Sequence, residues 1–216
     1  MSVFKHLSNE ELEQIDAQKV YQSFGKGEYL YKENSYPTGL YCISSGKIKL
    51  VNTGENGREH ILEILQAGDV AGEFAIFSNS VHRSSAIALE STQVCFIPKQ
   101  IFIELLHNNR MMTMDVLQTL AQNVESSQDK QKDLAQKTVK ERLASTLIHF
   151  KETYGETPEH YINIKFSREE IAGFIGTSTE TVIRLLSEWN NSHIITLKKK
   201  MIRINRLEEL NALAGA

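Results

Sequence analysis

Two charged side chains, Glu180 and Arg184, stand four residues apart in a stretch with helical character, so they share one face of a helix. An arginine can donate two parallel hydrogen bonds to O6 and N7 of guanine, and a glutamate can accept one from N4 of cytosine. A pair at this spacing can therefore read bases in a DNA major groove. A surface ion pair has the same spacing, and both interpretations hold together if the glutamate orients the arginine.

Three consecutive lysines, Lys198-Lys-Lys200, could supply a second kind of chemistry, the binding of phosphates. They lie between two short segments, 194–197 and 201–205, whose apolar and polar residues alternate. This pattern predicts a β-hairpin with a basic tip. A lysine triplet alone is usually a solvated turn, so its meaning depends on the element that precedes it.

The element that positions the glutamate and the arginine is a predicted helix-turn-helix. Ser167-Arg-Glu-Glu170 is a capping box, which begins a helix over 168–175. Gly176 permits a left-handed turn, and Thr177 or Ser178 caps a second helix. An αα-hairpin in a helical core is the alternative, but a basic hairpin directly after the unit favours a winged helix that binds DNA. The predicted DNA-binding residues are Ser178, Thr179, Glu180, Thr181, Arg184, Lys198, Lys199 and Lys200.

The overall net charge of −3 does not argue against DNA binding, because the charge is unevenly distributed. Residues 1–136 carry 12 basic and 17 acidic side chains, a net charge of −5, whereas residues 137–216 carry 12 basic and 10 acidic ones, a net charge of +2. This asymmetry is expected when one part of a chain binds a polyanion and the other part has a different role. We therefore expect at least two domains.

Residues 1–109 have the pattern of a β domain. Eight of the 12 glycines lie between Gly25 and Gly72, where they separate short segments of strand character. Such spacing predicts an all-β sandwich, jelly roll or barrel. The expected strands are 28–32, 40–43, 47–51, 60–65 and 86–97, with short helices over 9–20 and 99–107.

Residues 110–136 predict a helix about 40 Å long. A seam along it follows alternating four- and three-residue steps, as in a coiled coil. We expect two copies of the chain to pair through this helix, although the stripe could instead pack on its own β domain. The predicted dimerisation residues are Leu117, Leu120, Val124 and Leu134. A further helix is expected over 138–154, and residues 137–216 form the predicted DNA-binding domain.

These features together resemble the CRP/FNR family of bacterial transcription regulators over nearly the whole chain. The stretch from Phe166 to Leu186 is similar to the family's DNA-binding signature, and Gly68 to Phe77 with Arg83-Ser84 is similar to its cyclic-nucleotide phosphate-binding cassette. The resemblance implies an α+β protein with an N-terminal double-stranded β-roll (a jelly-roll-like domain of the cyclic-nucleotide-binding type), a dimerisation helix and a C-terminal winged helix-turn-helix. At Ile183 the sequence departs from the family, many of whose members have a small base-reading residue there.

The resemblance also implies a small effector, with a cyclic mononucleotide such as cyclic AMP as the first expectation. Arg83 would then clamp the phosphate, and Glu73 would accept a hydrogen bond from the ribose. The implied effector-binding residues are Gly72, Glu73, Phe74, Arg83, Ser84, Ser127 and Gln128. A relic pocket is the alternative, in a regulator that responds to haem, nitric oxide or redox signals or needs no effector. Glu73 and Arg83 would then be free to pair with each other.

Other classes of protein fit the sequence less well. It holds no run of about 20 apolar residues that could span a membrane, and its two cysteines indicate a cytoplasmic setting and cannot bind an iron–sulfur cluster that needs four thiolates. No nucleophile–base set or complete metal site is evident, so we expect no enzyme and no required cofactor. The expected partners are a palindromic double-stranded DNA site, a second copy of the chain and RNA polymerase. The remaining alternative is an effector-binding protein whose helix-turn-helix binds other proteins.

Overall fold

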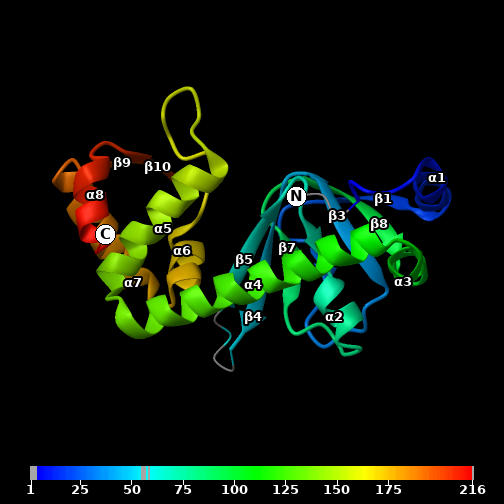
Figure 1. Cartoon of the computed structure of the whole chain (residues 1–216). Coiled ribbons are helices and arrows are strands. Elements are labelled where there is room, and N and C mark those ends of the chain that lie inside the picture. The colour runs from blue at the N-terminus through cyan, green and yellow to red at the C-terminus, as the bar shows by residue number, and fades with distance from the viewer. Residues whose placement is uncertain (1–3, 55–56, 58, 216) are drawn as a thin grey trace. The chain divides into compact units, whose positions relative to one another are not determined.

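The computed structural model describes residues 4–54, 57 and 59–215. The chain forms two compact units, Met1–Val124 and Glu125–Ala216, and each has its own core (Figure 1). The boundary falls inside one long helix, α4 (Arg110–Gln136), so each unit contains part of that helix. The predicted α+β architecture of β-roll, long helix and winged helix is confirmed.

The first unit is built around two four-stranded antiparallel sheets, with strand orders β1-β8-β3-β6 and β2-β7-β4-β5. Its strands are β1 (Val20–Phe24), β2 (Tyr29–Tyr31), β3 (Gly39–Ser45), β4 (Lys47–Thr53), β5 (Glu59–Gln66), β6 (Val70–Ala71), β7 (Ser85–Ala88) and β8 (Thr92–Pro98). Side chains such as Ile48, Ala86 and Val94 are fully buried in a core formed by residues of both sheets. The two sheets of the β-roll therefore share one core.

Helices cover part of the first of these sheets. They are α1 (Asn9–Gln18), α2 (Glu73–Phe77), α3 (Lys99–Asn108) and the first turns of α4. A second core joins them, in which Phe102 of α3 and Met112 of α4 are fully buried against Leu40 of β3. The beginning of α4 is therefore an integral part of the β-roll.

The second unit contains the last turns of α4 and a winged helix. Its further elements are α5 (Val139–Tyr154), α6 (Arg168–Ile175), α7 (Thr179–Asn191), β9 (Ile195–Lys198), β10 (Met201–Ile204) and α8 (Leu207–Leu213). Trp189 is buried at the end of α7, and Leu186, Leu147 and Leu143 complete the centre of this core.

The predicted elements differ from the observed ones at several places. The expected strand 86–97 is two strands, β7 and β8, which belong to different sheets. The helix expected over 9–20 ends at Gln18, because the chain enters β1 at Val20. Strands β1 and β6 and helix α8 have no counterpart in the prediction. None of the helices in the described part of the chain combines the length and apolar character needed to cross a membrane.

Candidate DNA-reading surface and effector cavity

The helix-turn-helix begins with the capping box that the sequence predicts. The Ser167 hydroxyl accepts from the backbone amide of Glu170 at 3.1 Å, and the Glu170 carboxylate accepts from the amide of Ser167 at 2.6 Å. Helix α6 ends at Gly176, whose backbone is left-handed with φ 66° and ψ 53°. Glycine adopts this conformation without the steric cost that other residues bear. The turn into α7 is thus fixed by local chemistry.

Helix α7 has two distinct faces. Its N-cap is Ser178, whose hydroxyl accepts from the Thr181 amide at 3.2 Å and lies 3.1 Å from the Thr181 hydroxyl. Val182, Leu185, Leu186 and Trp189 face the core. The opposite face, which we call the reading face, consists of Glu180, Ile183, Arg184 and Ser187, and all four are exposed. Their spacing of three, one and three residues places them in one stripe along the helix.

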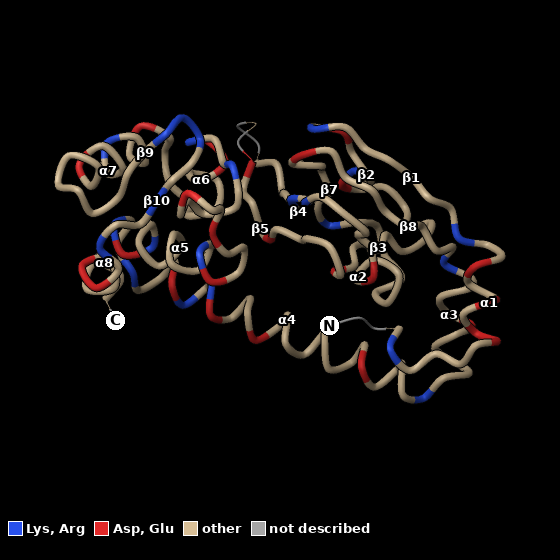
Figure 2. Tube along the Cα trace, turned by 90° about the horizontal axis from the view of Figure 1, so that it is seen from above, with Lys and Arg blue, Asp and Glu red and all other residues tan. Residues whose placement is uncertain are grey.

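The wing is a tight hairpin. Lys198 pairs with Met201, so Lys199 and Lys200 form a two-residue turn, and Ile202 and Ile204 are buried while all three lysines are exposed. Figure 2 shows the basic residues of this turn between β9 and β10. Three adjacent exposed ammonium groups concentrate positive charge at this tip, as phosphate binding would require. The structure thus brings the predicted lysines together at one tip.

Sequence reasoning missed a residue that supports this tip. Arg168, the first residue of α6, donates from Nη2 to the carbonyl oxygen of Lys199 at 3.3 Å. Burial lowers the pKa of the Arg168 guanidinium. Lys199 itself has a φ of 56°, a left-handed conformation that is costly for lysine. The hydrogen bond from Arg168 helps to hold this strained turn.

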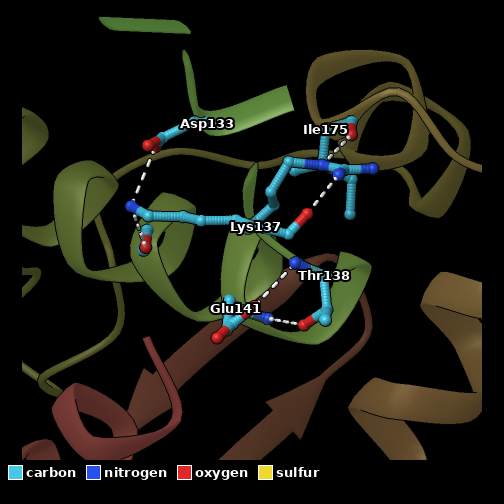
Figure 3. A network of polar contacts seen from close by, with 7 residues as sticks. Asp133, Lys137, Thr138, Glu141 and Ile175 are labelled. Atoms are coloured by element: carbon cyan, nitrogen blue, oxygen red, sulfur yellow. Dashed lines mark hydrogen bonds and ion pairs between the residues drawn. The ribbon is translucent and has the colours of Figure 1, made fainter. Parts of the chain in front are cut away.

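A polar network ties the end of α4 to the helix-turn-helix (Figure 3). Arg142 of α5 donates from Nη1 to the carbonyl of Lys137 at 2.7 Å and from Nε to the carbonyl of Ile175 at 2.9 Å. Lys137 donates to Asp133 at 2.9 Å, and Thr138 and Glu141 form a capping box that begins α5. Because the Ile175 carbonyl is the last of α6, one guanidinium joins the α4–α5 connection to the first helix of the reading unit.

The predicted dimerisation residues on α4 differ in exposure. Leu117, Val124 and Leu134 have exposed fractions of 53%, 55% and 44%, whereas Leu120 is half-buried and packs on the core of the first unit. Met114, with an exposed fraction of 56%, precedes Leu117 by three residues and was not predicted. Large exposed apolar side chains in a row along a helix are typical of a surface that another chain covers.

A cavity of about 220 Å³ lies in the first unit, between the β-roll and the first half of α4. The apolar residues that line it come from the sheets, α3 and α4. Its ionisable lining residues are all acidic. The ionisable side chains that line it are Glu63, Asp69 and Glu73, and neutral polar groups come from Thr119, Gln122 and Asn123. Among the residues that the structure describes, no lysine, arginine or histidine lines the cavity.

Glu73 is the most perturbed group of this cavity. Its Oε2 is shielded from solvent and has no hydrogen-bond partner among the residues that the structure describes. Burial, together with the smaller effect of the nearby carboxylates of Glu63 and Asp69, raises the pKa of Glu73 to about 7. Gly72, the N-cap of α2, has a φ of 101°, and a Cβ there would lie 3.0 Å from the Gly39 carbonyl oxygen. The backbone before Glu73 therefore requires glycine.

The other predicted effector residues are not gathered around this cavity. Arg83 and Phe74 are exposed and Ser84 is half-buried, and none of them lines it. Ser127 and Gln128 are exposed on α4 within the second unit. In the described part of the chain Glu73 and Arg83 form no ion pair, so the alternative in which they pair is not seen.

The two cysteines, Cys42 in β3 and Cys95 in β8, lie directly opposite each other in the antiparallel register. Both are free thiols, and burial raises the pKa of each. An iron–sulfur cluster ligated by cysteine takes four thiolates, which the two cysteines of this chain do not supply. Among the described residues, no three His, Cys, Asp or Glu side chains form a metal site.

Family models match both units. Residues 21–109 match the model of the cyclic nucleotide-binding domain, and residues 141–213 match that of the Crp-like helix-turn-helix domain. The first match covers the β-roll and α3, and the second covers α5 to α8. The reading face and the wing therefore lie within a known type of DNA-binding module.

Relatives match over most of the chain. It is 32% identical over 216 residues to the fumarate and nitrate reduction regulatory protein of Yersinia pestis, which covers 97% of this chain and 84% of that protein. Electron transport regulator A of Shewanella oneidensis is 33% identical over 192 residues, 88% of this chain and 76% of that protein. Both relatives are named as regulators.

Solved structures show the same fold. FixK2 from Bradyrhizobium japonicum superposes with a TM-score of 0.82 at 23% identity, over 92% of this chain and 98% of that one. A putative transcriptional regulator of the crp/fnr family from Eubacterium rectale also has a TM-score of 0.82, at 20% identity, over 100% and 99% of the two chains.

Proposed function

Because the chain belongs to the CRP/FNR family of transcription regulators, we propose that it acts as a homodimer that binds a palindromic DNA site through α7 and the wing. The observation that carries this proposal is the exposed reading face, on which Glu180 and Arg184 lie beside each other, in a unit whose wing exposes Lys198, Lys199 and Lys200. The side chains on α7 would read base edges, and the lysines would bind phosphates without regard to sequence.

The palindrome follows from the expected symmetry. Two chains paired through the exposed row of Leu117 and Val124 on α4 would be related by a two-fold axis. Recognition helices in such a dimer read half-sites about 34 Å apart, one turn of DNA. Leu134 lies beside Gly176 of its own chain. A Cβ placed on Gly176 would be 3.3 Å from Cδ2 of Leu134. We therefore assign the dimer contact chiefly to the residues before Leu134.

The test is a DNA-binding assay on the full chain. Operator duplexes are selected from a random library, and Arg184→Ala is then compared with Arg206→Ala, a matched loss of an arginine that lies outside the reading face. We expect Arg184→Ala to lose specific binding and Arg206→Ala to retain it. Equal base preference and affinity in the wild type and Arg184→Ala would refute the readout. Failure of the wild type to show salt-dependent DNA binding would favour a helix-turn-helix that binds proteins.

We further propose that the cavity beside α4 receives the effector, because residues of both the β-roll and the helix that leads to the reading unit line it. Its lining favours an uncharged or cationic ligand, since the carboxylates of Glu63 and Asp69, joined by Glu73 above its raised pKa of about 7, would repel a phosphate group. A cyclic nucleotide stays the competing prediction, and it requires Arg83 to face the phosphate.

Calorimetry with cyclic AMP and cyclic GMP separates the two predictions for the effector. We expect no binding heat from either nucleotide with the wild type, and no change in operator affinity when they are added. Binding that is lost in Arg83→Ala would instead support the cyclic-nucleotide prediction. A response of DNA binding to haem or to oxidants would support a different signal.

The route from the effector to DNA would pass through α4. A ligand beside Thr119 and Gln122 touches the helix directly, and the Arg142 network holds the other end of the helix to α6. A shift of α4 would therefore be passed along this helix to the reading unit. RNA polymerase is the expected partner of the DNA-bound dimer, and the cytoplasm its expected compartment.

A further inference from the structure

Ile183 is an unexpected residue on the reading face. It has an exposed fraction of 49%, and it lies between Glu180 and Arg184 in the stripe that the core leaves uncovered. The other large apolar residues of α7, namely Val182, Leu185, Leu186 and Trp189, are all buried. A single exposed isoleucine is unremarkable on most surfaces. Its place between two base-reading side chains makes it informative.

The major groove offers few apolar partners for such a side chain. Guanine and adenine present acceptors or donors there, cytosine presents an amino group, and only thymine presents a methyl group. An isoleucine placed against a polar base edge would strip water from donors and acceptors without replacing their hydrogen bonds. Against thymine it would bury apolar surface on both sides. Isoleucine in a helix is also largely confined to one χ1 rotamer, so the contact would require little ordering.

We propose that Ile183 reads the C5-methyl group of a thymine in each half-site, next to the bases read by Glu180 and Arg184. This inference rests on the proposed function, because it requires α7 to enter the major groove. It assigns to the protein an apolar specificity contact in addition to the polar ones. It also predicts that selected operators have an invariant thymine in each half-site at the position facing Ile183.

Thr179 and Thr181 are the other residues of α7 whose methyl groups could approach a thymine. Both stand in the first turn, and the Thr181 hydroxyl lies 3.1 Å from the Ser178 hydroxyl at the N-cap. Both are half-buried, whereas Ile183 is exposed in the centre of the stripe. The test therefore needs variants at Thr181 as well as at Ile183.

The experiment removes the methyl group from the DNA rather than from the protein. Operators are selected with the full-length wild type, each thymine is replaced in turn by deoxyuridine, and affinity is measured by fluorescence anisotropy. Deoxyuridine keeps the base pair and lacks only the methyl. We expect one position per half-site at which the replacement weakens wild-type binding about fourfold, and about fifteenfold when both half-sites are changed, from about 0.8 kcal/mol per buried methyl.

The protein variants identify the reader of that methyl. Ile183→Ala should bind thymine and deoxyuridine operators equally at this position, whereas Ile183→Val should keep part of the discrimination. Ser187→Ala, a change one turn further along the same face, should keep all of it. Circular dichroism should show the same fold for all of them, because Ile183 and Ser187 are exposed.

Two results would overturn the assignment while leaving DNA binding intact. One is a selected operator at which no deoxyuridine replacement weakens wild-type binding. The other is a preference for thymine over deoxyuridine that survives in Ile183→Ala and disappears in Thr181→Ser. That result would assign the contact with the methyl group to Thr181. If the wild type selects no operator at all, the proposed function itself fails, and the assignment of Ile183 fails with it.

Discussion

Replacing Glu73 by glutamine should make the β-roll more stable at alkaline pH. The carboxyl is buried beside Glu63 and Asp69, and its pKa rises from 4.5 to about 7 in the folded chain. A raised pKa means that the folded state holds its proton more tightly than the unfolded state does. The stability that the tighter proton binding of Glu73 contributes is therefore fully present below pH 4.5. This contribution is lost as the pH rises from 4.5 through about 7.

The size of this loss follows from the shift. At about 1.36 kcal/mol per pKa unit, a rise from 4.5 to about 7 corresponds to about 3 kcal/mol of folding free energy at pH 8. Glutamine has nearly the same shape and no charge, so Glu73→Gln should lack this pH-dependent loss. We expect the variant to be more stable than the wild type by up to about 3 kcal/mol at pH 8 and by much less at pH 4.5.

Urea unfolding followed by far-ultraviolet circular dichroism measures the difference. Fluorescence of the single tryptophan would not serve alone, because Trp189 lies in the second unit. Glu13→Gln, which removes a charge from the exposed surface of α1, is the matched control and should change stability little at either pH. A Glu73→Gln effect that is the same at both pH values, or a variant less stable than the wild type at pH 8, would refute the argument.

Three further predictions concern the backbone and the dimer. Lys199→Gly should raise the free energy of unfolding by up to about 1 kcal/mol, because glycine tolerates the left-handed φ, yet it should weaken DNA binding and lower the salt slope by about 0.9 per wing. Urea unfolding and salt titrations check both effects, and an unchanged salt slope would contradict the phosphate contact. Gly72→Ala should destabilise the chain by about 1–3 kcal/mol, through positive φ and crowding against Gly39, and a thermal melt without change would contradict this. Leu117→Glu should yield monomers in analytical ultracentrifugation while the fold persists, because Leu117 is exposed in the single chain; a persistent dimer would move the interface elsewhere.

Local signals account for the parts of the fold that the sequence predicts well. The capping box at Ser167 and Glu170 marks the beginning of α6, and the left-handed Gly176 marks its end, because caps act through neighbouring residues. Helix α4 has the predicted bounds, since its apolar period continues without a proline or glycine. Long-range pairing accounts for the failures. The run 86–97 reads as one strand because apolar residues dominate both of its ends, and only the sheets show that the chain crosses between them.

The candidate sites divide in the same way. The residues of the reading face and the wing are close in sequence, so a motif can place them together. The acidic cavity could not be foreseen, because Glu63 and Asp69 reach Glu73 only through the folding of β5 and the turns beside β6. Arg168 supports the wing across a separation of 31 residues by donating to a backbone carbonyl. A pattern of side chains in the sequence cannot reveal such a contact.

The attachment of α4 to the helix-turn-helix restricts which insertions and deletions the coding sequence of this helix can accept. Leu134 lies against Gly176, and Arg142 holds the Lys137 and Ile175 carbonyls, so the end of the helix is fixed in its rotation within the reading unit. Each residue of an α-helix turns it by about 100°. One inserted or deleted codon between Leu117 and Leu134 would therefore turn the pairing surface about 100° away from the DNA-reading unit, even if every contact in both units survived. The length of this helix should tolerate substitution far better than insertion or deletion.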